Sequence, residues 1–163
     1  MRPSRRKRKI LSPTALRRVL ARERRAGRTV VFTNGCFDIL HVGHVRYLNA
    51  ARQLGDRLVV GLNTDASVRR LKGPLRPVTG QKQRAEVMAA LESVDYVTFF
   101  STPTPLTLIR AVNPDVLVKG GDWKVRDIIG SDWVLSRGGK VRSLPFVKGF
   151  STTRMLQKIQ KLG

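Results

Sequence analysis

Short apolar runs alternate with amphipathic segments along the chain, and this alternation predicts its secondary structure. The runs are rich in β-branched residues and have the length of buried strands. We expect strands at residues 29–32, 57–63, 94–100, 115–119 and 140–144. Between the runs, apolar residues recur with the spacing of one helix face. We expect helices at residues 12–27, 45–55, 64–73, 81–91, 131–136 and 151–162, and a further one that ends at Val112.

Strands that alternate with helices indicate a parallel sheet that is covered by helices on both faces. We therefore expect a single α/β domain with a doubly wound, five-stranded parallel sheet. In such a domain the ligand binds at the carboxyl ends of the strands. The stretches with candidate functional residues follow strands directly, at residues 33–44, 63–76, 119–123 and 149–153. In the helix at residues 81–91, the spacing places Val87, Met88 and Leu91 on the buried side.

Charge changes this picture at the N-terminus. The chain of 163 residues has 32 Lys and Arg against 11 Asp and Glu, a formal net charge of +21, and residues 1–28 contain the single acid Glu23. We expect residues 1–10 to form a disordered basic arm, because they are charged and almost without apolar residues, and residues 11–163 to form the domain. Such an arm attracts nucleic acid or an anionic membrane surface, or it is a solvated extension.

Cysteine content and hydropathy point to the cytoplasm. The single cysteine, Cys36, excludes an intramolecular disulfide. The sequence has no apolar run of membrane-spanning length, and no apolar core of a secretory signal follows the basic N-terminus. We therefore expect a cytoplasmic protein without a membrane span.

Residues 33–44, Thr-Asn-Gly-Cys-Phe-Asp-Ile-Leu-His-Val-Gly-His, link a predicted strand to a predicted helix and hold both histidines of the chain. A helix N-terminus offers unpaired N–H groups and partial positive charge, which favour phosphate. His41 and His44 can donate hydrogen bonds to phosphate oxygens, and Gly43 lets a phosphate chain approach the backbone. A metal pair is the first alternative, although no carboxylate or cysteine has the usual third-ligand spacing. Two surface histidines are the second.

The second predicted strand is followed by polar and basic candidates. Lys72 and Arg76 lie on a proline-bounded loop and can act as a cationic lid. Asn63 and Asp65 are candidate contacts to an acceptor or a ribose, and Asn34 is similar. For Lys72 the alternative is a solvated loop lysine.

The fourth and fifth predicted strands also end in distinctive residues. Two glycines, 120 and 121, allow a sharp turn under a ligand, Asp122 can bind hydroxyls, and Trp123 offers a flat apolar face. A structural tryptophan at the edge of the core is the alternative for Trp123. Residues 151–153, Ser-Thr-Thr, cap the last helix, whose start is itself an anion site.

Together these motifs resemble those of the cytidylyltransferase-like nucleotidyltransferases, whose signature is Gly-x-Phe-Asp followed by His-x-Gly-His. The full sequence of residues 33–44 is similar to the corresponding motif of one branch, the D-glycero-β-D-manno-heptose 1-phosphate adenylyltransferases. So are Leu-Lys-Gly-x-x-Arg-Pro at 71–77, Lys-Gly-Gly-Asp-Trp at 119–123 and Gly-x-Ser-Thr-Thr at 149–153. The resemblance spans about residues 12 to 162 and implies a Rossmann-like fold.

The resemblance implies an activity: transfer of AMP from ATP to heptose 1-phosphate, giving ADP-heptose and pyrophosphate for the lipopolysaccharide core. We expect direct in-line transfer without a covalent intermediate, with Mg²⁺ bound through the ATP phosphates and not by side chains. Alternatives are CMP transfer to glycerol 3-phosphate or a similar alcohol phosphate, and AMP transfer to FMN. Phe146 stands where glycerol-phosphate cytidylyltransferases carry an arginine, which argues against the cytidylyl branch.

Partners follow from the same resemblance. In this branch a heptose kinase is often fused upstream, and we expect it to be a separate chain here. We expect a homo-oligomer, a dimer. A basic nucleic-acid-binding protein is the alternative from another class, but the chain lacks helix-turn-helix, RNP and zinc-finger wording, so we do not expect nucleic acid to be the main partner.

The expected site residues fall into three groups. The catalytic residues are His41, His44 and Lys72. The nucleotide-binding residues are these histidines and Thr33, Asn34, Gly35, Cys36, Phe37, Gly43, Arg84, Gly120, Asp122, Ser151, Thr152 and Thr153. The acceptor-binding residues are Asp38, Asn63, Asp65, Arg76 and Trp123. Arg84 matches an arginine position of related enzymes, and a solvent-facing helical arginine is its alternative.

Overall fold

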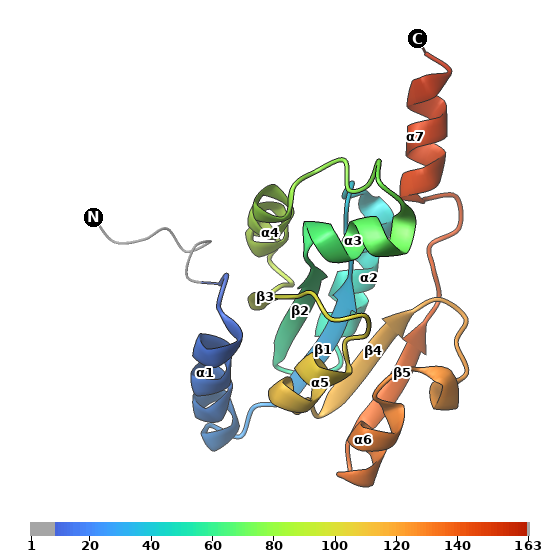
Figure 1. The fold of residues 1–163 in the computed structure, drawn as a ribbon. Coiled ribbons are helices and arrows are strands. Elements are labelled where there is room, and N and C mark those ends of the chain that lie inside the picture. The colour runs from blue at the N-terminus through green and yellow to red at the C-terminus, as the bar shows by residue number, and fades with distance from the viewer. Residues whose placement is uncertain (1–8, 163) are drawn as a thin grey trace.

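Five parallel strands form one sheet at the centre of the protein. The structure is a computed structural model that describes residues 9–162. The strands are β1 (Val30–Gly35), β2 (Arg57–Asn63), β3 (Tyr96–Phe100), β4 (Val116–Gly120) and β5 (Lys140–Leu144), in the order β3-β2-β1-β4-β5 (Figure 1). The predicted doubly wound parallel sheet is confirmed, and its order reverses between β1 and β4.

Most helices occupy the predicted segments, but the helix expected at residues 45–55 begins and ends three residues earlier. The helices are α1 (Pro13–Arg25), α2 (Val42–Arg52), α3 (Asp65–Lys72), α4 (Gln81–Ala90), α5 (Leu106–Val112), α6 (Ser131–Ser136) and α7 (Thr152–Gln160), with a short 3-10 helix, η1 (Val125–Asp127). Three of them begin at hydroxyl caps, because the side chains of Ser12, Thr64 and Ser151 accept backbone N–H groups of the first turn. None of the helices within residues 9–162 has both the length and the apolarity to cross a membrane.

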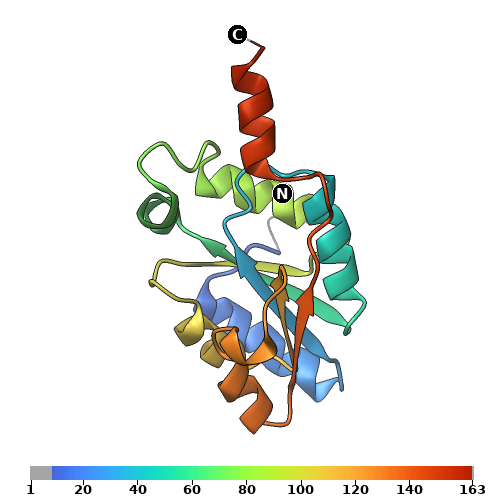
Figure 2. The same ribbon diagram turned by 90° about the vertical axis from the view of Figure 1, so that its right-hand side faces the viewer.

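Strand alternation divides the core into two halves. Val31, Val60 and Val118 pack with α2 and α4 on one face, which we call the α2 face. Phe32 and Leu117 pack with α1, α5 and α6 on the other, the α5 face. Figure 2 shows these two groups of helices on opposite sides of the sheet, and α7 projecting beyond its carboxyl edge. A fully apolar strand with helices on both faces is what the sequence pattern predicts.

Helix α4 differs from its prediction. Val87, expected on the buried side, is 45% exposed, whereas Arg84 is 1% exposed. Ala85, Met88 and Ala89 complete the inner side with Arg84. An arginine takes an inward position here because its guanidinium finds hydrogen-bond acceptors inside the domain, as described below.

The domain begins earlier than predicted. Lys9 and Ile10, assigned to the basic arm, lie along the edge of β3: the Val97 N–H donates to the Lys9 carbonyl at 2.8 Å, and the Leu11 N–H donates to the Val97 carbonyl at 2.9 Å. The remainder of the predicted arm, residues 1–8, lies outside the described residues. The boundary after residue 10 is therefore wrong for its last two residues.

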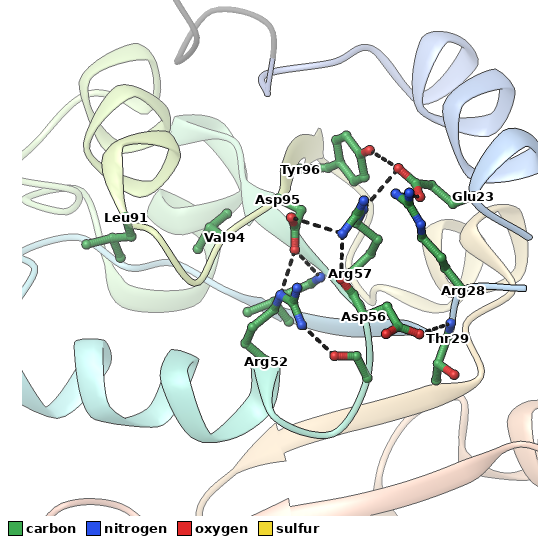
Figure 3. Close-up of polar contacts among 12 residues, drawn as sticks. Glu23, Arg28, Thr29, Arg52, Asp56, Arg57, Leu91, Val94, Asp95 and Tyr96 are labelled. Carbon is green, nitrogen blue, oxygen red and sulfur yellow. Dashed lines mark hydrogen bonds and ion pairs between the residues drawn. The ribbon is translucent and has the colours of Figure 1, made fainter. Parts of the chain in front are cut away.

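Helix α1 is fixed to the amino ends of the strands by Glu23. Its carboxylate accepts hydrogen bonds from Arg28 at 2.7 Å, Arg57 at 3.0 Å and the Tyr96 hydroxyl at 2.6 Å (Figure 3). Burial and the hydrogen bond to the Glu23 carboxylate together raise the pKa of Tyr96 to about 12, so the phenol remains a donor. Asp95 receives the Arg52 guanidinium at 2.9 Å in the same region. This network lies at the edge of the sheet opposite the one with the candidate functional residues.

Candidate functional site

A cavity of about 890 Å³ opens at the carboxyl edge of the sheet. It is lined by the ends of β1, β2 and β4, the start of α2, and the segment that leads into α7. The order of the strands reverses between β1 and β4, so the cavity lies where a doubly wound sheet binds its ligand. The cavity therefore lies at the edge of the sheet where the sequence predicts the ligand site.

Two stacked histidines stand where α2 begins. His41 is the N-cap residue and makes no side-chain cap hydrogen bond. The His41 and His44 rings have centroids 3.9 Å apart at an interplanar angle of 22°. Each Nδ1 atom is buried without a hydrogen-bond partner among residues 9–162. A Cβ atom on Gly43 would lie 2.9 Å from the His41 ring, so a larger residue here would displace that ring from its observed position in the stack.

Both histidines favour the neutral form in the free protein. Burial is the main cause that lowers the pKa of His44 to about 4, and the adjacent His41 is the second cause. Burial also lowers the pKa of His41. A polyphosphate placed beside the rings would reverse these shifts, since a negative charge favours the imidazolium. The pair is therefore suited to an anionic ligand.

Phe37 holds the turn before the histidines. Its φ of 45° lies in the left-handed region, which non-glycine residues rarely adopt. Phe37 is 8% exposed, and its ring meets the His44 ring edge to face, with centroids 5.2 Å apart. Such local strain is sustained where surrounding structure fixes the chain, as it often does at functional sites.

Asp38 and Arg76, predicted to contact the acceptor, form an ion pair with each other. The Asp38 carboxylate accepts from Arg76 at 2.6 Å and from the N–H groups of Val78 and Thr79 at 2.9 Å. Burial alone would raise the pKa of Asp38, but these hydrogen bonds and the guanidinium charge hold it below its ordinary value. The pair fixes the loop at residues 73–80 to the turn that carries the histidines.

Arg84 serves the same turn from within the core. Its guanidinium donates to the carbonyls of Thr79, Cys36 and Asn63 and to the Asp65 carboxylate, at 3.0, 2.6, 2.8 and 2.8 Å. The side chain is 0% exposed, so the solvent-facing alternative is wrong. Arg84 does not line the cavity, and neither does Asp65. Both act on the shape of the site.

The end of β4 forms an aromatic wall. Gly121 has a φ of +110°, and a Cβ atom there would lie 2.9 Å from the Phe146 ring and 3.1 Å from Nε1 of Trp123. Trp123 lines the cavity, is 49% exposed, and donates from Nε1 to the Gly120 carbonyl at 3.1 Å. Its position therefore agrees with a ligand contact more than with a buried structural role. Asp122 is exposed and lies outside the cavity lining.

The start of α7 forms a further part of the cavity wall. The Ser151 hydroxyl accepts from the Arg154 N–H at 3.1 Å, as the predicted cap. The Thr152 hydroxyl donates to the Ile39 carbonyl at 3.4 Å, which ties this helix start to the histidine turn. Residues 151–153 all line the cavity.

Most of the predicted site residues line one cavity. They are Asn34, Gly35, Cys36, Phe37, Asp38, His41, Gly43, His44, Asn63, Lys72, Gly120, Trp123, Ser151, Thr152 and Thr153. Thr33 does not: it is fully buried, and its hydroxyl pairs with the Tyr47 hydroxyl at 2.6 Å. Arg76 is also outside the lining.

Several lining residues were not among the expected site residues, although some belong to the stretches singled out in the sequence. Tyr47 comes three residues after His44, so helical spacing was a usable signal, and Lys119 directly precedes the two glycines. Phe146 was noted for its departure from a related family and not as a wall of the site. The others are mostly apolar or belong to loops: Leu71, Phe100, Pro103, Pro105, Ile129, Val147, Lys148, Gly149 and Phe150.

Carboxylate ligands for a metal ion are not assembled at the site. Within residues 9–162, no group of three or more His, Cys, Asp or Glu side chains could hold an ion. Asp38 and Asp65 are occupied by arginines. The groups that face the cavity are imidazoles, ammonium groups, hydroxyls and amides, which suit phosphate oxygens better than they suit Mg²⁺.

The fold and the site together define a class. A doubly wound parallel sheet with paired histidines, lysines and helix starts at its switch point is typical of proteins that bind phosphorylated nucleotides. The family model described as Cytidylyltransferase-like matches residues 32–157. The chain therefore belongs to the cytidylyltransferase-like family, a family of nucleotidyltransferases.

Individual relatives are similar over the whole domain. Bifunctional protein HldE of Trichlorobacter lovleyi is 55% identical over 151 residues, which make up 93% of this chain and 31% of that protein. Bifunctional protein HldE of Syntrophotalea carbinolica is 56% identical with the same coverage. The chain thus spans about a third of the length of these relatives.

Two solved structures extend the comparison. The lipopolysaccharide core biosynthesis protein from Thermoplasma volcanium is 28% identical with a TM-score of 0.60, over 76% of this chain and 100% of that one. Pantothenate synthetase from Thermus thermophilus has the same TM-score at 17% identity, over 85% of this chain and 62% of that one, which is a likeness of fold alone.

Proposed function

We propose that the chain is an adenylyltransferase that moves AMP from ATP to D-glycero-β-D-manno-heptose 1-phosphate and releases ADP-heptose and pyrophosphate for lipopolysaccharide core synthesis. The stacked His41–His44 pair at the start of α2, facing a cavity at the switch point of the sheet, carries this proposal. The wording of residues 33–44 and the similarity to the bifunctional HldE proteins favour the heptose substrate. The lipopolysaccharide protein from Thermoplasma volcanium adds to this support.

The reaction needs positioning more than acid–base chemistry. An oxygen of the acceptor phosphate attacks the α-phosphorus of ATP, and the bond from that phosphorus to the bridging oxygen of the β-phosphate breaks. The acceptor phosphate is largely ionised near neutral pH, since its second pKa is about 6, so no general base is required. Transfer is then direct and in line, and the chain stabilises the charge that develops on the phosphates.

The residues of the site divide these tasks. His41 and His44 donate hydrogen bonds to the nucleotide phosphates, and the start of α7 with Ser151 and Thr152 offers further donors. Lys72 neutralises charge between nucleotide and acceptor. Mg²⁺ belongs to the substrate in this proposal, bound by the ATP phosphates. Asp38, Arg76 and Arg84 act by holding the loops in place.

Pyrophosphate release tests the proposal. The purified chain with Mg²⁺ is given ATP or CTP together with heptose 1-phosphate, glycerol 3-phosphate or FMN. We expect turnover with ATP and heptose 1-phosphate alone, and a fall in kcat of about 10²–10³-fold in His41→Ala. Lys82→Ala, on the exposed side of α4, is the control. Turnover with CTP and glycerol 3-phosphate would show a glycerol-phosphate cytidylyltransferase in place of the heptose 1-phosphate adenylyltransferase. No turnover with any pair would overturn the proposal.

The cellular context rests on the same proposal. A heptose kinase activity would supply the acceptor, and a cytoplasmic location would give access to ATP. A dimer is also part of the proposal, because Met155 and Ile159 of α7, and Leu162 just after the helix, are exposed apolar residues that a second copy would cover. Analytical ultracentrifugation of the wild-type chain and of Ile159→Glu tests the dimer, which the substitution should weaken.

A further inference from the structure

The cavity extends over both faces of the sheet, and strand alternation shows which residues belong to each part. On β4, Val116 and Val118 face the α2 side and Leu117 the α5 side. Successive side chains of a strand point to opposite faces, so Lys119 leaves β4 on the α5 face. By the same alternation Asn63 follows Leu62 onto the α5 face. Both residues line the cavity.

The two parts of the cavity have different chemistry. The part on the α2 face holds the histidine pair, Tyr47 and the hydroxyls at the start of α7, which together provide many donors for a phosphate chain. The part on the α5 face is bounded by apolar residues such as Phe100, Pro103 and Ile129. Lys119 is the strand residue that brings a positive charge into this second part.

Lys119 has no anionic partner within the described structure. Its side chain is half-buried, and none of residues 9–162 forms a hydrogen bond or ion pair with its Nζ atom. Burial lowers the pKa of Lys119, the nearby Cys36 thiol opposes this, and the positive charge of Lys72 lowers it further. Lys119 and Lys72 line the same cavity, and a bound dianion would stabilise two positive charges that face one cavity.

We infer that the part of the cavity on the α5 face is the acceptor subsite, and that Lys119 binds the phosphate of a sugar 1-phosphate there, across from Lys72. This inference rests on the proposed function. Lys119 takes the place of three residues that the sequence predicts as acceptor contacts. Asp38, Arg76 and Asp65 form ion pairs within the protein instead. The apolar wall then packs against the sugar ring, and the nucleotide occupies the α2 face.

Substitutions of Lys119 test the inference by separating the two substrates. Lys119→Met keeps an unbranched side chain that is one atom shorter and removes the charge, and Lys119→Arg restores the charge. Lys140→Met, an exposed lysine at the amino end of β5, is the matched control for loss of one charge. We expect Lys119→Met to raise KM for heptose 1-phosphate about 10- to 100-fold, the effect of one charge-assisted hydrogen bond. Its Kd for a non-hydrolysable ATP analogue without acceptor should stay within about threefold, and Lys119→Arg should recover part of the loss.

Binding measurements keep this inference distinct from the proposed function. Wild type and Lys119→Met are titrated calorimetrically with heptose 1-phosphate, glycerol 3-phosphate and FMN in the presence of the ATP analogue. If wild type shows no turnover of heptose 1-phosphate, the proposed function fails, yet a phosphate ester that binds Lys119→Met at least tenfold more weakly upholds the inference. Equal binding by both proteins, a change confined to the ATP analogue, or binding of none of the three esters overturns it. Lys119→Gln repeats each comparison if the methionine variant does not fold.

Discussion

At the scale of single residues, the histidine pair has an unusual electrostatic state. Two imidazoles that stack at 3.9 Å cannot both be protonated without repulsion, and burial disfavours the charged form of each. In the free protein the rings therefore act as neutral hydrogen-bonding groups. Their charge becomes available when a polyphosphate arrives, which links ligand binding to proton uptake.

This state predicts how stability depends on pH. The pKa of His44 is about 4 in the folded protein and about 6.5 when unfolded. Between these values the unfolded chain binds more protons, so the free energy of unfolding should rise with pH through this window and level off above it. We expect His44 to contribute about 1–2 kcal/mol to this rise, because solvent screens a partly exposed ring. Urea unfolding between pH 4.5 and 7.5 measures it.

Substitution isolates the contribution of the ring. His44→Gln should show a shallower rise over the same window, whereas His41→Gln should keep most of it because His41 is the less buried of the two. Asp38 and Asp65 do not interfere, since their pKa values are lowered and they titrate below this window. Equal slopes in wild type and His44→Gln would contradict the prediction.

The role of a residue could be predicted from the sequence where that role follows from its place next to a strand or helix. The histidines, Gly43 and the Ser151 cap are defined by their places after a strand or before a helix. The roles of the charged residues could not be predicted in this way. Asp38, Arg76 and Arg84 are residue types that often bind ligands, but here they form hydrogen bonds with other groups of the protein. Such pairings join positions that are far apart in the chain, and no local pattern indicates them.

At the scale of elements, the loop at residues 73–80 is held as part of the site. Asp38 receives one guanidinium and two backbone N–H groups from it, and the Asp38 side chain is 1% exposed. Arg84 adds a bond to the Thr79 carbonyl. The loop follows α3, whose last residue is Lys72, so its anchoring fixes Lys72 relative to the histidines.

Removing this anchor should cost stability and activity together. Arg76→Ala leaves a buried carboxylate with two N–H donors and no counter-charge, so we expect a loss of about 2–3 kcal/mol in the free energy of unfolding. We expect kcat to fall, because Lys72 becomes less well positioned. Chemical denaturation and steady-state kinetics measure the two effects.

The alternative for Arg76 makes a different prediction. If Arg76 contacted the acceptor, its loss would raise KM for heptose 1-phosphate and leave the unfolding curve unchanged. Arg69→Ala, an exposed arginine on α3, is the control for loss of positive charge near this loop. A raised KM at unchanged stability would return Arg76 to the acceptor site.

The periodicity of apolar residues predicted most boundaries of strands and helices. The predictions were wrong where hydrogen bonds of polar side chains determine the local structure. Apolar runs and hydroxyl caps locate most strands and helices to within a residue or two. Strand β3 begins at Tyr96 and not at residue 94, because the Asp95 carboxylate accepts the Leu58 N–H and lies outside the ladder. In α4 the buried side includes Arg84 in place of Val87, since hydrophobic spacing takes no account of a guanidinium with internal acceptors.

At the scale of the whole molecule, the two edges of the sheet have separate roles. The carboxyl edge holds the cavity, and the amino edge holds the network around Glu23 that fixes α1 (Figure 3). The family model begins at residue 32, so α1 precedes the matched region. Its side chains nevertheless belong to the core, because Leu16 and Leu20 are 1% and 0% exposed.

This arrangement predicts where the basic N-terminus can be shortened. Deleting residues 1–8 removes five basic residues and none of the contacts described here, so we expect an unchanged melting temperature and kcat/KM within about twofold of wild type. Binding to heparin or DNA should weaken and become less salt-dependent. Deleting residues 1–28 should prevent folding. Each buried leucine contributes about 2–5 kcal/mol, and the loss of Glu23 leaves Arg57 and Tyr96 without their acceptor, against a total stability of about 5–15 kcal/mol.

A point substitution separates the role of α1 from that of its charge. Glu23→Gln keeps the shape of the side chain and removes the counter-charge of Arg57, so we expect a loss of about 2–4 kcal/mol in the free energy of unfolding. Arg18→Gln, on the exposed side of the same helix, should change stability by less than about 0.5 kcal/mol. If the longer deletion folded and turned over substrate like wild type, α1 would be an appendage and the Glu23 network dispensable. If the shorter deletion is fully active and the longer one does not fold, residues 9–28 are needed for folding, as the buried leucines of α1 imply.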